Sequence, residues 1–178
     1  RNETFRLTDT DWMFTHPITL DAVCFGRVEP EPGALSSLMR KISPEDWDIM
    51  HAIPDFIGVN SYNGSEIAAD ADGWPVYLPR PRGFPCTALK WPVTPEIMEY
   101  GYAFLYERYQ LPLYVTECGL SCNDRIYLDG QVHDADRIDF LHRYLLALRK
   151  GSERADIHGF FHWSLTDNFE WHSGYAER

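Results

Sequence analysis

A carboxylate at the end of an apolar run is the clearest candidate for chemistry in this sequence. Glu117 directly follows residues 111–116, which have the length and composition of a buried strand. A side chain at that point is held on a rigid element and is partly desolvated, which suits a nucleophile that attacks an anomeric carbon. A glutamate that makes a structural ion pair at a strand end fits the same pattern. Glu117 alone therefore leaves both interpretations open.

A second cluster combines aromatic and acidic side chains over residues 163–171. Trp163 and Trp171 flank Asp167, Asn168 and Glu170. Indole faces stack on the C–H face of a pyranose ring, and carboxylates accept hydrogen bonds from its hydroxyls. This composition suits sugar recognition, but an aromatic core segment with a capped turn has the same composition.

Asn60 and Tyr62 follow another short apolar run, residues 55–60. A tyrosine hydroxyl at this position is able to donate to a nucleophilic carboxylate and keep it ionised, although a tyrosine at a strand exit also serves as packing. The histidines show no metal-ligand spacing, and there is no glycine-rich phosphate loop. The sequence therefore predicts neither a metal nor a cofactor.

The elements that must position these residues alternate between helix and strand. Helices are expected at residues 43–52, 94–109 and 134–150, and strands at 55–60, 111–116 and 158–164. This order is typical of an α/β fold with a parallel sheet, in which chemistry gathers at the carboxyl ends of the strands.

Ser43 and Thr94 are predicted to cap the first two helices, each followed by a proline. The third helix is predicted to bury one apolar stripe, formed by Ile138, Leu141, Leu145 and Leu148. Gly151 is predicted to end this helix. Residues 64–92 read as one long loop, expected to be a lid or binding loop with contacts from Trp74, Tyr77 and Phe84.

Composition excludes several classes of function. The 178 residues are 44% hydrophobic, which is enough for one domain, residues 1–178. A net charge of −11 argues against nucleic acid or an anionic membrane as partner, and no apolar run approaches the ~20 residues that span a bilayer. An acidic chain with four scattered cysteines is typical of a cytoplasmic protein with free thiols. The chain begins with Arg1 rather than Met, so we expect that the start of the gene product precedes it.

Taken together, ordered stretches of the chain resemble motifs of one family, the retaining β-glucosidases of the first glycoside hydrolase family. Residues 116–119 (TECG) resemble its nucleophile motif T-E-N-G, and 163–171 (WSLTDNFEW) match W-S-L-x-D-N-F-E-W. Residues 55–62 (DFIGVNSY) resemble D-F-x-G-x-N-Y-Y. Residues 137–141 (RIDFL) and 174–178 (GYAER) are similar to R-I-x-Y-L and G-Y-x-x-R.

The resemblance implies a fold and a role for each candidate residue. Members are (β/α)₈ TIM barrels, so this chain would hold about strands six to eight with their helices. Glu117 would form the covalent glycosyl-enzyme and Tyr62 would hydrogen-bond to it. The residues expected to bind a terminal β-D-glucosyl or galactosyl group are Asn60, Trp163, Glu170 and Trp171. The aglycone and the choice between glucose and galactose stay open.

Departures from the family pattern limit what the chain does alone. Cys118 and Ser61 replace the usual Asn and Tyr, which we expect to change packing rather than chemistry. The family's N-E-P acid/base motif does not occur, and three strands cannot close a barrel of about 250 residues. The N-terminal half of the same enzyme is expected to supply the acid/base. The alternative is a truncated chain that folds alone, by self-association, and is inactive.

Other functions stay open from the sequence. The alternatives are a catalytically dead carbohydrate-binding protein that kept its sugar-facing aromatics, a transglycosidase, and a 6-phospho-β-glycosidase. The Glu170–Trp171 pair resembles the form that family members acting on unphosphorylated sugars have, which favours a plain β-glycoside as substrate.

Overall fold

The computed structural model of the protein describes residues 16–28, 41–72 and 75–176. The described residues fall into two compact units. One contains residues up to 55 together with 65–79, and the other contains 56–64 and the residues from 80 onward. The second unit carries the candidate site residues.

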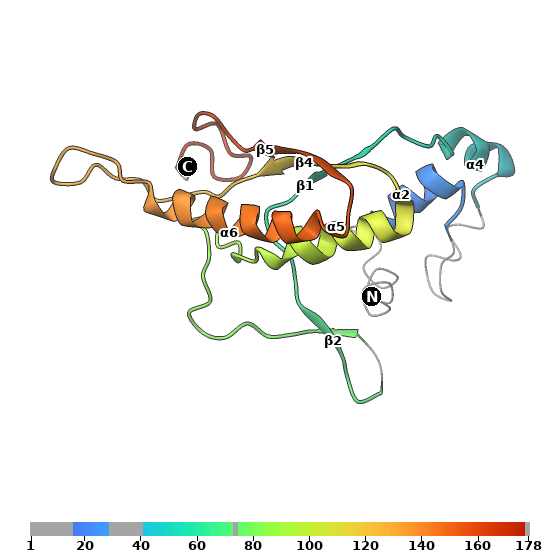
Figure 1. Cartoon of the computed structure of the whole chain (residues 1–178), viewed down its shortest axis with the longest axis horizontal. Helices are drawn as coiled ribbons and strands as arrows, with labels where there is room; N and C mark the ends of the chain where they lie inside the picture. Colours follow the sequence, from blue (N-terminus) through green and yellow to red (C-terminus); the bar gives the residue numbers. More distant parts are fainter. Residues whose placement is uncertain (1–15, 29–40, 73–74, 177–178) are drawn as a thin grey trace. The chain divides into compact units, whose positions relative to one another are not determined.

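A three-stranded parallel sheet is the centre of the second unit (Figure 1). Its strands are β1 (Ile57–Asn60), β4 (Leu113–Cys118) and β5 (Ile157–His162), paired in the order β1-β4-β5. Helix α5 (Glu96–Tyr109) precedes β4 in the chain, and α6 (Ala135–Gly151) connects β4 to β5. The predicted α/β pattern with parallel strands is confirmed.

The core of this unit lies between the sheet and the two helices, which run side by side in Figure 1. Burial of each large apolar side chain contributes about 1.5–3 kcal/mol. The strands contribute Ile57, Leu113 and Val115, and the helices contribute Met98, Tyr102, Leu105, Phe140, Tyr144 and Leu148.

Strand β4 carries one extra residue near its C-terminal end. Val59 pairs with Val115, but the next residue of β1, Asn60, pairs with Glu117 rather than with Thr116. On the other side two residues of β4, 116 and 117, oppose the single residue Phe161. Such a bulge interrupts the alternation of faces and redirects a side chain. Here the redirected residue is Glu117.

The apolar stripe predicted for α6 is confirmed at Leu148 and wrong at Ile138 and Leu145. Ile138 and Leu145 are 63% and 44% exposed, whereas Phe140, Tyr144 and Leu148 are buried. The rings of Phe140 and Tyr144 stack with centroids 3.8 Å apart, so these two aromatic residues fill much of the space beneath the helix together with Leu148.

Of the two predicted helix caps, one is confirmed. Ser43 caps α4 (Pro44–Met50): its side chain accepts from the Asp46 amide, and the Asp46 carboxylate accepts from the Ser43 backbone. Thr94 does not cap α5, because its hydroxyl oxygen accepts the Gly64 amide at 2.8 Å instead. Thr94 thus ties the exit of β1 to the start of α5.

The first unit contains elements that the sequence did not predict. Helix α2 (His16–Phe25) lies where the sequence signals are mixed, and its Val23 carbonyl accepts the Ala52 amide. The expectation of one continuous loop over 64–92 is wrong, because β2 (Ile67–Ala69) and β3 (Pro75–Tyr77) pair as an antiparallel hairpin. The Asp70 side chain accepts the Asp72 amide and supports the chain reversal.

The four cysteines are free thiols, as predicted. None of the helices in the described ranges has the length and apolar character that a bilayer span requires.

The close crossing of α5 and α6 gives a test of the core. A Cβ on Gly151 would approach the Met98 carbonyl oxygen to 2.5 Å, and backbone cannot yield. We expect Gly151→Ala to lower the free energy of unfolding by about 1–3 kcal/mol, measured by urea denaturation. Gly101→Ala is the matched control: its Cβ meets only the flexible Ile97 side chain, so stability should stay equal or rise by about 1 kcal/mol. Equal losses in both variants would contradict the packing.

Candidate active site

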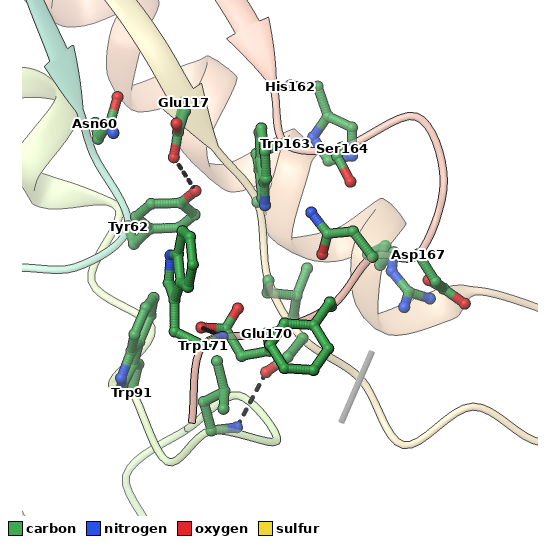
Figure 2. A pocket seen from close by; sticks show the side chains of 17 residues that line it. Asn60, Tyr62, Trp91, Glu117, His162, Trp163, Ser164, Asp167, Glu170 and Trp171 are labelled. Carbon is green, nitrogen blue, oxygen red and sulfur yellow. Dashed lines mark hydrogen bonds between the residues drawn. The ribbon is translucent and has the colours of Figure 1, made fainter. Parts of the chain in front are cut away.

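Glu117 and Tyr62 point toward one another at the carboxyl edge of the sheet (Figure 2). The Tyr62 hydroxyl donates to Glu117 Oε2 at 2.5 Å. Burial, and then the hydrogen bond to Glu117, raise the pKa of Tyr62 far above its usual value. Tyr62 therefore remains a proton donor over the working range of pH, and its hydroxyl fixes the orientation of the carboxylate.

The backbone of Tyr62 is fixed from helix α6. The hydroxyl of Tyr144 donates to the Tyr62 carbonyl at 2.8 Å and accepts the Thr94 amide at 2.9 Å. Tyr144 is fully buried, and burial raises its pKa to about 12. Hydrogen bonds at the backbone and at the hydroxyl of Tyr62 thus connect α6 to Glu117.

Asn60 stands beside Glu117 because the bulge pairs these two residues. The Thr116 hydroxyl donates to Asn60 Oδ1 at 2.8 Å, and this bond fixes the orientation of the amide. The Ser61 amide donates to the Glu117 carbonyl at 2.7 Å. The backbone on either side of the carboxylate is therefore held by β1.

The two departures from the family pattern point away from this site. Cys118 is fully buried, and burial raises the pKa of its thiol to about 12. The Ser61 side chain is also buried, 2.8 Å from the Tyr102 hydroxyl. Neither residue lines the cavity described next, which agrees with the expectation that these changes affect packing.

A cavity of about 510 Å³ opens in front of Glu117. Its size falls in the range of small-molecule sites. All six predicted site residues line it, namely Asn60, Tyr62, Glu117, Trp163, Glu170 and Trp171. The structure brings them together from three strand ends and the segment after β5, while their individual roles stay predictions.

The segment after β5 supplies a tryptophan-rich wall to this cavity. Its end is closed by paired backbone hydrogen bonds between Glu170 and Gly174. Trp163 and Trp171 are 44% and 88% exposed, so both indoles are accessible to a ligand. Large exposed aromatic faces beside carboxylates are the surface that sugar binding uses.

Trp91 also lines the cavity and was not singled out from the sequence. Its ring meets Tyr62 edge to face with centroids 5.4 Å apart. The turn that carries it is pinned because Ser121 accepts the amides of Ala88 and Leu89. Its location in the segment 64–92, flagged as a binding loop, was the available signal.

His162 and Arg137 are two more cavity residues that the sequence did not place in the site. The spacing of the histidines gives no metal-ligand pattern, and no other pattern in the sequence marks His162. Arg137 forms ion pairs with Asp124 and Asp134 at 2.8 and 2.6 Å, and these bonds raise its pKa further. Its charge is therefore already balanced by two carboxylates.

The three contacts expected from residues 64–92 are not found in the cavity. Phe84 lines a separate cavity of about 580 Å³, and Tyr77 belongs to the other unit. Trp74 lies outside the described residues, as does Arg178 of the last motif. Within the described ranges no cluster of three His, Cys, Asp or Glu side chains is arranged to hold a metal ion.

Comparison with known proteins agrees with this geometry. The model of the family described as "Glycosyl hydrolase family 1" matches residues 2–178. The chain belongs to glycosyl hydrolase family 1. A β-glucosidase A from Thermotoga maritima is 35% identical over 153 residues, which cover 83% of this chain and 34% of that protein. A bifunctional β-D-glucosidase/β-D-fucosidase from Bifidobacterium breve is 35% identical over 152 residues, or 75% and 33%.

Solved family 1 structures show the same partial coverage. A β-glucosidase from T. maritima superposes with a TM-score of 0.77 at 29% identity, over 97% of this chain and 39% of that one. Structures of the T. maritima enzyme with glucoimidazole and with galacto-hydroximolactam also match. The similar structures are TIM barrels, so β1, β4 and β5 form part of such a barrel. The chain spans about a third of the length of the curated relatives it matches.

The Tyr144 hydroxyl allows a direct test of how Tyr62 is held. Tyr144→Phe leaves the Tyr62 carbonyl and the Thr94 amide without their partner, so we expect a loss of about 1–3 kcal/mol in unfolding free energy. Tyr100→Phe, at an exposed ring of α5, is the control and should change little.

The same hydroxyl makes stability dependent on alkaline pH. Because the folded pKa of Tyr144 is raised to about 12, its contribution is complete below about pH 10 and is lost as pH rises toward 12. The difference between wild type and Tyr144→Phe in urea midpoint should shrink over that interval. A difference that is constant from neutral pH to pH 12 would contradict the assignment.

Proposed function

We propose that this chain is the nucleophile-bearing part of a retaining β-glycosidase that removes terminal non-reducing β-D-glucosyl or galactosyl residues. The observation that carries the proposal is the Tyr62–Glu117 hydrogen bond at the floor of a cavity walled by Trp163, Trp171 and Glu170. An oriented carboxylate, an aromatic platform and a hydroxyl-binding carboxylate are what attack on a bound pyranose requires.

The reaction follows from these groups in two displacements. Glu117 attacks the anomeric carbon, the glycosidic C–O bond breaks, and a second carboxylic acid gives its proton to the departing oxygen. Water then attacks the same carbon, the second carboxylate takes its proton, and Glu117 leaves as a carboxylate. Because Oε2 already accepts the Tyr62 hydroxyl, we assign the attack to Oε1.

The acid/base carboxylate is proposed to come from the N-terminal half of the same enzyme. Retaining enzymes place the two carboxyl groups about 5–5.5 Å apart on opposite sides of the sugar ring. The absence of the N-E-P motif from this sequence supports this division, as does its coverage of only 34% of the T. maritima β-glucosidase A. Closure of the barrel by that half would also cover the exposed Phe56 and Phe161.

Charge around the cavity favours an unphosphorylated sugar. Glu117, Asp167 and Glu170 line it, whereas Arg137 is the single Lys or Arg among the described residues that do so. Since two aspartates already neutralise Arg137, a 6-phosphate would meet net negative charge. Both gluco- and galacto-configured ligands occur in the matching T. maritima structures, which supports either sugar as substrate.

A carbohydrate-binding protein without catalysis is the second candidate, because the exposed Trp163 and Trp171 do not require a nucleophile to bind a sugar.

A cytoplasmic location is proposed on the four free thiols.

Covalent labelling of the complete protein separates the two candidates. A 2-deoxy-2-fluoro-β-glucoside with a good leaving group should add one fluoroglycosyl group to Glu117, located by peptide mass spectrometry. Glu117→Gln should abolish labelling and reduce turnover on the order of 10⁵-fold, because it removes a nucleophile that acts in both displacements. Glu153→Gln, an exposed residue beyond α6, is the control and should retain both.

Retained sugar binding without any labelling would contradict the enzyme and favour the binding protein. Labelling at Asp167 or Glu170 instead would contradict the assignment of the nucleophile. Binding is measured by tryptophan fluorescence, since Trp91, Trp163 and Trp171 all line the cavity.

A further inference from the structure

Two hydrogen-bond donors contact the backbone carbonyl oxygen of Cys118, the residue directly after Glu117. The Trp163 amide donates to the Cys118 carbonyl at 2.9 Å, and His162 Nδ1 lies 3.0 Å from the same oxygen. A carbonyl only accepts, so Nδ1 of His162 must carry the proton. In the neutral imidazole Nε2 is then the unprotonated nitrogen.

This contact lies directly after an irregular stretch of the β4–β5 ladder. Val115 of β4 pairs with Phe160 of β5, and the next pair is Cys118 with His162. Two residues of β4 therefore lie opposite the single residue 161 between these pairs. Inside the bulge, β5 therefore offers fewer backbone partners than a regular ladder would. The His162 side chain adds a bond to β4 at the first position after the interruption.

The Trp163 backbone packs directly against Gly119. A Cβ at that position would overlap the Trp163 carbonyl oxygen, so only glycine leaves room for the backbone of Trp163, whose amide donates to the Cys118 carbonyl. On the opposite side, β1 holds the Glu117 carbonyl through the Ser61 amide. The peptides at Glu117 and Cys118 are thus held from both neighbouring strands.

We propose that His162 is a positioning residue: through Nδ1–H and the Cys118 carbonyl it holds the β4 bulge so that Glu117 faces the sugar-binding cavity. The inference rests on the proposed function, in which Glu117 attacks the anomeric carbon. It assigns to His162 an effect on the attack and none on the binding of the sugar. A small displacement of an attacking atom is enough to slow a reaction by up to about 100-fold.

Three variants of the complete protein test this role. His162→Ala removes the donor, whereas His162→Asn keeps one, because the Asn side-chain nitrogen is as many bonds from Cα as Nδ1. His158→Ala is the matched control on the same strand; its ring packs on Tyr114 and its Nε2 pairs with Asp156. The 2-deoxy-2-fluoroglycoside gives the maximal labelling rate and the half-saturating concentration separately.

For His162→Ala we expect the maximal labelling rate to fall about 10-fold to 100-fold with little change in the half-saturating concentration. His162→Asn should recover most of that rate, and His158→Ala should resemble wild type. An unchanged rate in His162→Ala would overturn the proposal. A change confined to the half-saturating concentration would also overturn it, because it would make His162 a ligand contact.

Selective ¹⁵N-histidine NMR in mildly alkaline buffer gives a readout that does not depend on catalysis. The His162 signal, assigned by its loss in His162→Asn, should show the Nδ1–H tautomer. The Nε2–H tautomer would overturn the proposal even if the enzyme is active. If wild-type protein binds sugar but is not labelled, the proposed function fails, and the tautomer alone then decides whether His162 holds β4.

Discussion

The site depends on the bulge in β4. One extra residue, Thr116, shifts the pairing so that Glu117 lies opposite Asn60 and its carboxylate meets the Tyr62 hydroxyl. A regular strand would keep Glu117 on the face of Leu113 and Val115, which are buried. Burial of a carboxylate among apolar residues is unfavourable, so the bulge and the ionisable side chain require one another.

The helices make this irregular strand end rigid. The Tyr144 hydroxyl of α6 donates to the Tyr62 carbonyl and accepts the Thr94 amide, and the Tyr102 hydroxyl of α5 lies within hydrogen-bond reach of Ser61. The hydroxyls involved are buried in the same core that joins α5 to α6. The same buried contacts therefore stabilise the core and orient the Glu117 carboxylate. A loss of packing in the core would also disturb the position of that carboxylate.

Much of this arrangement was predictable from local signals. Apolar strand runs located the sheet, and three ordered motifs named six residues that line one cavity. The serine–proline pair at the start of α4 likewise marked its N-cap, Ser43. What failed depends on tertiary contacts. Aromatic stacking of Phe140 on Tyr144 sets the buried face of α6, and the hydroxyl of Thr94 bonds to Gly64 rather than to its own helix. Trp91 and His162 reach the cavity through turns and a register shift that no periodicity encodes.

The central claim is that the redirected carboxylate of Glu117 attacks the anomeric carbon, so that hydrolysis proceeds with retention of the configuration at that carbon. Proton NMR of the complete protein acting on an aryl β-glucoside tests this most directly, because the anomer released first is seen before mutarotation. Double displacement at Glu117 predicts that the β-anomer appears first and the α-anomer follows slowly. Initial release of the α-anomer would mean that water attacks directly, and it would contradict the role of Glu117 as nucleophile.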